Sequence, residues 1–207
     1  MNPEEQKKAI AAYHASISFM DEQVGRLLDT LDRLQIRHNT VVVFISDHGF
    51  NLGEHTAWQK NSLWEESVRV PVIVSVPDMQ TAGQRSDAIV ELNDLYPTFL
   101  ELAGFKGKAP DILQGESWIP LLKDPQSYDP SDYAYTIVGQ KGASIRTDRW
   151  RYNRWGEEAE GTNEELYDHH QDPRENHNLA RDPAHAKQLK QLRSRFEEAR
   201  TLARNKP

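Results

Sequence analysis

The run of β-branched and apolar residues at 40–46 constrains the fold of this chain more than any other feature. A strand without polar alternation is typical of burial on both faces, as in a parallel α/β sheet. Residues 71–77 predict a second buried strand of the same kind. A long helix is predicted before the first strand, over about residues 4–36, with one buried apolar stripe. The stripe comprises Ile10, Tyr13, Ile17, Met20, Val24, Leu27, Leu28, Leu31 and Leu34.

A second helix is predicted over residues 95–104. Asp94 precedes it as a candidate cap, Pro97 lies in its first turn, and Gly104 is its C-terminal stop. The predicted order is therefore helix, strand, loop, strand, helix. This order is typical of an α/β fold.

After Lys123 the sequence pattern changes to turns and short strand candidates. The dipeptides Asp124-Pro125 and Asp129-Pro130 indicate a turn-rich linker, so we expect one domain over residues 1–123 and another over residues 124–207. Closely spaced strand candidates in the second domain predict a small antiparallel sheet, followed by a C-terminal helix. The strand candidates are residues 133–138, 143–146, 150–154 and 165–168, an acidic hairpin loop covers 156–163, and the helix covers 183–204 with Leu189, Leu192, Phe196 and Leu202 on one side.

Composition excludes several classes of protein and of site. Lysine and arginine number 25 against 32 acidic residues, and the net charge of −7 argues against a nucleic-acid binder held by phosphate contacts. No stretch approaches the roughly 18 apolar residues that a membrane span needs. The chain has no cysteine, which excludes disulfides, thiolate metal sites and a cysteine nucleophile. An anionic substrate would therefore be held by a metal ion or by a few local cations.

The segment after the first predicted strand concentrates chemically useful side chains. Asp47 and His48 come just past the carboxyl end of that strand, where open α/β sheets place ligand sites. Because Gly49 follows, the carboxylate and the imidazole could both turn toward one cation. His55 and Lys60 come shortly afterwards, and such groups can hold an anionic ester beside a metal. The loop therefore predicts a site for a divalent metal and an anionic ester.

Each of these residues also has a structural explanation when it is taken alone. Asp47 could be a turn residue, His48 a loop cap, and Lys60 a solvated surface lysine. A single histidine such as His55 is more often structural than catalytic. The occurrence of all four on one loop at the end of a strand favours the functional interpretation.

Short segments in a fixed order carry a resemblance to a known family. They are residues 12–28, Ser46-Asp47-His48-Gly49, Leu52-Gly53-Glu54-His55, Lys60 with residues 63–71, residues 94–98, and residues 165–168 with 172–179. In this order they resemble the sulfatases of the alkaline-phosphatase-like superfamily, most closely those like iduronate-2-sulfatase. The resemblance implies the C-terminal part of an α/β sulfatase fold, followed by a small antiparallel-sheet subdomain with a C-terminal helix.

The resemblance also implies roles for individual residues. Asp47 would bind the metal through a carboxylate oxygen, and His48 would complete that side of the metal site. Calcium is the usual metal of the family, but an imidazole is softer than calcium prefers, so His48 could instead contact the sulfate or the nucleophile. Lys60 would be catalytic, because it would hold a sulfate oxygen and neutralise charge on the leaving ester oxygen. His55 lies in a family motif and is expected, like Lys60, on the substrate-binding side.

Two elements of the family have no counterpart in this sequence. The family's nucleophile is a formylglycine, which is made from the first residue of a Cys/Ser-x-Pro/Ala-x-Arg motif. The nearest imitation, residues 75–79, has no arginine at the fifth place. The paired N-terminal aspartates that bind the metal are also missing. We therefore expect a C-terminal fragment of a sulfatase, with the formylglycine in the missing N-terminal half.

This expectation has consequences for cofactor, substrate and partners. Asp47 and His48 give at most two ligands where calcium takes about six to eight oxygens, so weak or no calcium binding is expected in this chain alone. Hydrolysis of a sulfate ester, including one on a sulfated glycan, is expected only from a complete site. The expected protein partners are a second copy of the chain or the N-terminal half.

Two other functions stay open at this point. A phosphonate or phosphodiester hydrolase of the same superfamily can have the same metal loop. A non-catalytic binding module could keep the fold, and it predicts that Asp47→Ala and Lys60→Ala leave the activity of a complemented enzyme unchanged. A full-length family member is expected in the periplasm, in the lysosome or outside the cell, whereas this chain indicates no compartment.

Overall fold

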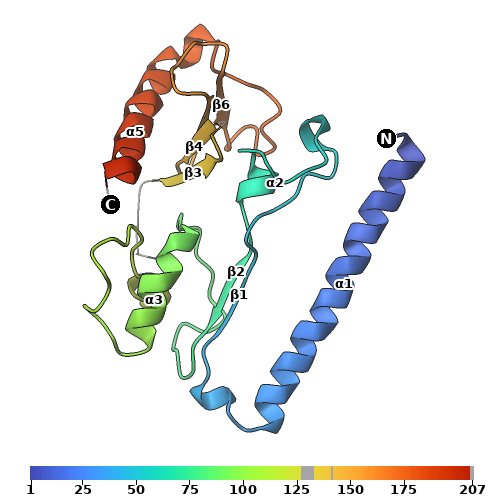
Figure 1. Ribbon diagram of the computed structural model, residues 1–207, viewed down its shortest axis with the longest axis vertical. Helices are drawn as coiled ribbons and strands as arrows, with labels where there is room; N and C mark the ends of the chain where they lie inside the picture. The colour runs from blue at the N-terminus through green and yellow to red at the C-terminus, as the bar shows by residue number, and fades with distance from the viewer. Residues whose placement is uncertain (127–132, 141, 206–207) are drawn as a thin grey trace. The chain divides into compact units, whose positions relative to one another are not determined.

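The computed structural model describes residues 1–126, 133–140 and 142–205, so Asp129-Pro130 of the predicted linker lies outside the described residues. The chain divides into two compact units (Figure 1). The domain boundary predicted after Lys123 stays a prediction. No helix in the described part of the chain has the length and apolar character that a membrane crossing requires. The first unit comprises Met1–Lys60 and Arg69–Ala82, and the second comprises Asn61–Val68 and Gly83–Pro207.

The first unit begins with the long helix α1, Pro3–Arg33. Asn2 and Glu5 form a capping box at its start, in which each side chain accepts a hydrogen bond from the other residue's backbone N–H. The predicted buried stripe is wrong in this structure, because α1 has no buried residue and Ile17 and Leu27 are 42% and 68% exposed. An amphipathic face is buried only against another surface, and among the described residues this face is covered in part: Val24 and Leu28 are half-buried, and the Tyr13 ring lies 5.9 Å from that of Phe50. Pairing with a second chain stays a prediction.

Strands β1 (Val42–Ile45) and β2 (Val72–Ser75) form a two-stranded ribbon. They are antiparallel, with Val42 opposite Ser75, so the predicted parallel and fully buried arrangement is wrong for this pair. Every residue of β1 is half-buried, and Ile73 of β2 is 62% exposed. A ribbon of two strands leaves outer edges and faces uncovered, whatever the side chains prefer. The short helix η1, Arg37–Asn39, connects α1 to β1.

Asp94 connects several segments of the second unit through hydrogen bonds to its side chain. Its carboxylate does not cap the following helix; it accepts hydrogen bonds from the Glu91 N–H at 2.9 Å, the Glu116 N–H at 2.8 Å and the Trp118 indole N–H at 3.0 Å. The prediction for Gly104 is confirmed, because its φ of +83° ends the helix in a conformation that glycine adopts without strain. The helical elements here are α2 (Glu65–Val68), η3 (Leu92–Asp94), α3 (Leu95–Leu102) and α4 (Ile119–Lys123).

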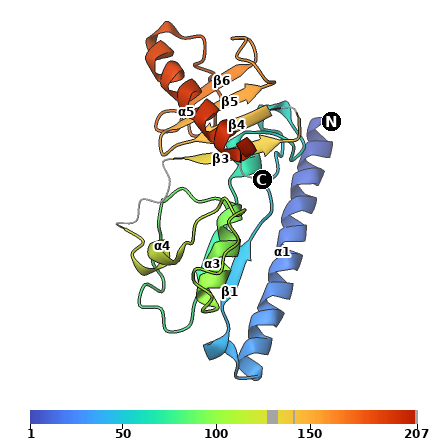
Figure 2. The same cartoon turned by 60° about the vertical axis from the view of Figure 1, so that its left-hand side comes forward.

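The predicted antiparallel meander is confirmed. Its four strands lie in the order β3-β4-β5-β6, with every neighbouring pair antiparallel. Figure 2 shows helix α5 lying across this sheet. The strands are β3 (Ala134–Val138), β4 (Gly142–Arg146), β5 (Trp150–Trp155) and β6 (Glu164–Asp168), and the final helices are η4 (Pro183–His185) and α5 (Ala186–Asn205).

The core of the second unit lies between this sheet and α5. Tyr152 and Phe196 meet edge to face with ring centroids 5.3 Å apart, and both are buried. Leu189 and Leu192 are buried as predicted, but Leu202 is 60% exposed, so its predicted place on the core face is wrong. At 3.6 residues per turn Leu202 is rotated by about 240° from Phe196, which takes it off the stripe.

Several carboxylates of the second unit have a pKa below the ordinary value, among them Asp168 and Glu164. The hydrogen bonds from Arg149 lower the pKa of Asp168. Burial raises the pKa of Glu164, but hydrogen bonds from Arg193 and Tyr152 outweigh it and lower the pKa overall. These groups therefore bind protons less readily in the folded chain than in the unfolded one.

The stability of the second unit is consequently expected to fall in acid. Burial also raises the pKa of Glu175, but His169, Arg151 and the Glu65 amide lower it below its ordinary value of 4.5 overall. Since the folded pKa is depressed, the stabilisation is complete above about pH 4.5 and is lost as the pH falls through the folded value. Urea unfolding followed by tryptophan fluorescence should show this decline. Glu175→Gln should flatten it, and an equal slope in that variant would contradict the assignment.

Candidate active site

Asp47 and His48 follow β1 directly. The His48 N–H donates to Asp47 Oδ1 at 3.0 Å, and the Ser46 hydroxyl donates to the His48 carbonyl at 2.8 Å, so the chain turns tightly here. The Asp47 side chain is 85% exposed, and its Oδ2 lies 3.5 Å from His48 Nε2. The carboxylate therefore stands open to solvent beside the imidazole.

Lys60 lies at the far end of the loop, and its side chain reaches back to His48. Its Nζ lies 2.9 Å from His48 Nε2, while His48 Nδ1 lies 2.8 Å from the Gly49 carbonyl oxygen. A carbonyl oxygen only accepts and an ammonium group only donates. The hydrogen bonds therefore fit the imidazole tautomer that carries its proton on Nδ1, with the Nε2 lone pair facing Lys60.

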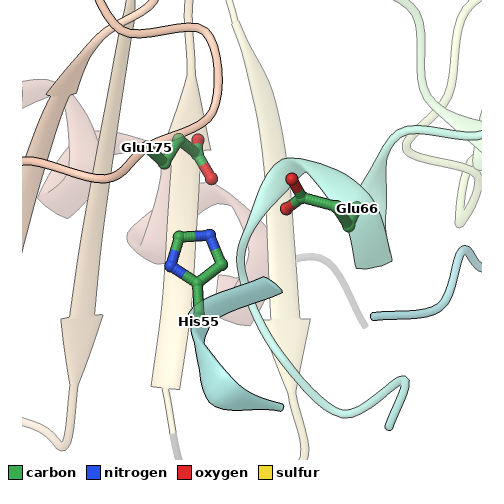
Figure 3. A group of neighbouring side chains, drawn as sticks. All are labelled: His55, Glu66 and Glu175. Carbon is green, nitrogen blue, oxygen red and sulfur yellow. The ribbon is translucent and has the colours of Figure 1, made fainter. Parts of the chain in front are cut away.

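The structure thus brings together three of the four side chains that the sequence selected, namely Asp47, His48 and Lys60. The fourth, His55, lies on the short helix η2 (Glu54–Thr56), where its φ is +52° (Figure 3). Non-glycine residues rarely adopt this conformation, and such residues concentrate at functional loops. A role of His55 in substrate binding stays a prediction.

Comparison with known proteins decides the family. The family model described as Sulfatase matches residues 1–105, which is just over half of the chain. This chain belongs to the sulfatase family. The recognition of a sulfatase within the alkaline-phosphatase-like superfamily is therefore confirmed, and the α/β fold class with it.

Three similar proteins show how much of a sulfatase this chain represents. A sulfatase from Formosa agariphila is 35% identical over 175 residues, which are 84% of this chain and 33% of that protein. Mouse iduronate 2-sulfatase is 37% identical over 48% of this chain and 22% of its own length. A solved structure in complex with its substrate D-glucosamine-2-N,6-O-disulfate has a TM-score of 0.82 at 32% identity and covers 93% of this chain and 40% of the other. The chain thus spans about a third of the length of the Formosa relative.

The residues of this sulfatase chain fit only part of a divalent-metal site. Asp47 supplies a carboxylate and His48 an imidazole nitrogen. Groups of three or more ligand-type side chains exist among the described residues, but none of them includes Asp47 or His48. Because calcium takes about six to eight oxygen ligands, these two residues do not make a complete calcium site.

A second cluster with ligand-type side chains lies in the second unit, and the sequence did not point to it. Glu65, His169 and Glu175 lie close enough to hold a metal. However, the Arg151 guanidinium donates to both the Glu65 and the Glu175 carboxylates, and His169 Nε2 lies 2.7 Å from Glu175 Oε1. Arg146 Nε also lies 3.6 Å from Glu65 Oε2, so two guanidinium groups face the two carboxylates, and we interpret the cluster as a buried ion-pair network.

This network connects two segments that carry the family resemblance. Glu65 lies on α2, within residues 63–71, and its backbone N–H donates to the Glu175 carboxylate at 2.8 Å. Figure 3 shows Glu175 on the loop segment that approaches α2. Both acids lie in segments that carry the resemblance given above, and this shared feature was the signal that could have paired them.

Proposed function

We propose that this chain supplies the Lys60 side of the active site of a sulfate-ester hydrolase, together with two of its metal ligands. The contact of 2.9 Å between Lys60 Nζ and His48 Nε2, beside the exposed Asp47 carboxylate, carries the proposal. The membership of the chain in the sulfatase family supports it. The remaining ligands and the nucleophile would come from the part of the fold that the longer relatives possess.

The chemistry proposed for Lys60 follows from its charge and flexibility. An ammonium group is a compact charge with three donors on a flexible stem. It can hold a sulfate oxygen and follow the change in geometry as the ester bond breaks, while it neutralises charge on the leaving oxygen. The net charge of −7 makes such a local cation necessary for an anionic substrate.

The proposed task of Asp47 and His48 is to hold one side of a cation, and calcium is the metal that we propose. A bound metal ion would supply Lewis-acid polarisation of the sulfate oxygens. The Gly49 carbonyl accepts a hydrogen bond from Nδ1–H and thereby orients the imidazole. The Nε2 lone pair, which faces Lys60 Nζ at 2.9 Å, would bind the cation once the ammonium turns to the sulfate. The Asp47 side chain is 85% exposed, so its carboxylate stays open to a cation.

The proposed substrate class is a sulfated sugar. The structural neighbour in complex with D-glucosamine-2-N,6-O-disulfate supports this class, as does the similarity to iduronate 2-sulfatase. We propose this substrate class for the complete enzyme, since this chain spans only part of either relative.

The isolated chain is expected to bind calcium weakly or not at all and to leave an aryl sulfate intact. Two ligands cannot replace the hydration shell of the ion, and the chain has no Cys/Ser-x-Pro/Ala-x-Arg motif from which a formylglycine could form. Titration calorimetry with calcium and a release assay with an aryl sulfate test the two points. Tight calcium binding or turnover by the pure chain would show that the site is complete here.

A fusion behind the preceding part of a sulfatase relative tests the proposed activity itself. We expect the fusion to bind calcium and to cleave a sulfate ester faster than a phosphonate monoester. The reverse preference would favour the phosphonate hydrolase. A fusion that binds calcium but cleaves neither ester would favour a binding module.

A further inference from the structure

Lys60 can meet His48 only if the backbone reverses between them, and Asn51 closes that reversal. The Asn51 backbone N–H donates to the Gln59 carbonyl oxygen at 3.0 Å, and the Asn51 side-chain Nδ2 donates to the same oxygen at 2.9 Å. A carbonyl oxygen has two lone pairs, so Asn51 uses both. Asn51 is fully buried, and water therefore does not compete for these bonds.

The clamped carbonyl belongs to the peptide unit that carries the Cα atom of Lys60. Because a peptide unit is planar, fixing the Gln59 oxygen also fixes the position of that Cα atom. A lysine side chain is long and flexible, so its contact with His48 depends on where the side chain starts. Asn51 therefore sets the position of the Lys60 Cα atom through one rigid peptide unit.

The loop inside the clamp adopts a conformation that needs external support. His55 has a φ of +52°, which is costly for a residue with a side chain. Gly53 has a φ of +119°, and its N–H donates to the Ala57 carbonyl at 2.9 Å. This inner bond closes the tip of the loop. The two hydrogen bonds from Asn51, in contrast, hold Gln59, the residue next to Lys60.

We propose that Asn51 is a positioning residue for Lys60. Its buried amide holds the Gln59 carbonyl and so sets the Lys60 ammonium against His48 Nε2. The inference rests on the proposed function, because the placement of Lys60 matters to chemistry only if this site binds an anionic ester. In Asn51→Asp the side-chain donor is replaced by a carboxylate oxygen that faces the Gln59 carbonyl oxygen, with little change in side-chain size. The side-chain hydrogen bond is lost, and the repulsion between the two oxygens should push the Gln59 carbonyl away from the remaining backbone N–H.

Nitrogen NMR of the histidine rings tests the proposal in the chain as it exists. The spectra compare four proteins labelled with ¹⁵N-histidine: the unmodified chain, Asn51→Asp, Lys60→Ala and the double variant. We expect Asn51→Asp to move the His48 Nε2 resonance to its position in Lys60→Ala. The double variant should show no further change, because both substitutions remove the same contact.

Three additional variants make the result decisive. His48→Gln assigns the resonance, and Asn51→Ala removes the donor without adding a charge. Asn39→Asp makes the same chemical change at an exposed asparagine of the first unit and should leave the His48 signals unchanged. A His48 Nε2 resonance that stays in place in folded Asn51→Asp and Asn51→Ala would overturn the proposal, as would further movement in the double variant.

The NMR experiment separates this inference from the proposed function. The resonances require neither metal nor substrate. If the fusion lacks sulfatase activity while the His48 signal follows Asn51, the proposed function fails and the positioning role stands. If the fusion is active while the His48 signal ignores Asn51, the positioning role alone fails.

Discussion

Arg151→Met is expected to reduce the free energy of unfolding of the second unit by about 3–5 kcal/mol, because it leaves the buried Glu175 carboxylate without its guanidinium partner and leaves Glu65 with Arg146 alone. Arg151 is buried, and its guanidinium donates to Glu65 and Glu175, whose side chains are 15% and 0% exposed. It also donates to Ser144 Oγ at 3.1 Å. Methionine has a similar length and no charge, so the loss of packing contributes little. Urea unfolding at neutral pH, followed by tryptophan fluorescence, measures the difference.

Two comparisons distinguish this effect from a general sensitivity to arginine removal. Arg204 forms an ion pair with Glu157 on the surface, and Arg204→Met should leave the unfolding midpoint unchanged. Adding Glu65→Gln and Glu175→Gln to Arg151→Met removes the unpaired charges and should recover part of the lost stability. Equal midpoints for Arg151→Met and Arg204→Met would contradict the buried network.

Lys60→Ala is expected to lower kcat/KM for a sulfate ester by about 10²–10³ in the active fusion, which is the usual effect of removing one charge-stabilising donor. The loss should appear mainly in kcat if the ammonium stabilises the leaving oxygen more than the bound ester. Steady-state kinetics with an aryl sulfate measure both constants. We select Lys60 for substitution because its Nζ lies 2.9 Å from His48 Nε2, which places a positive charge at the proposed site.

A matched lysine on the same unit provides the control. Lys8 is exposed on α1, and Lys8→Ala should leave both constants unchanged. Asp47→Ala should reduce both activity and calcium affinity, since it removes a ligand. If Lys60→Ala and Asp47→Ala retain the activity of the fusion, the loop has a structural role and the chain contributes no catalytic group.

Several local features could be predicted from the sequence because they depend on neighbouring residues. The meander of β3 to β6 follows from strand-length segments that are separated by short turns. Gly104 ends α3 because glycine accepts a positive φ. Asp47 and His48 lie together because they are adjacent residues past the end of β1, so their proximity required no knowledge of the tertiary fold.

Other features depended on partners that are distant in the sequence. Antiparallel pairing of β1 with β2 and the exposure of α1 are set by which surfaces are present, since an apolar pattern states only what a segment could bury. Arg151 meets Glu65 across 86 positions of chain, a pairing that no local pattern encodes. The approach of Lys60 to His48 likewise required the folded loop. The sequence by itself determined which groups are present and the local turns, whereas only the tertiary structure decided which groups meet, because contacts between distant residues depend on the path of the whole chain.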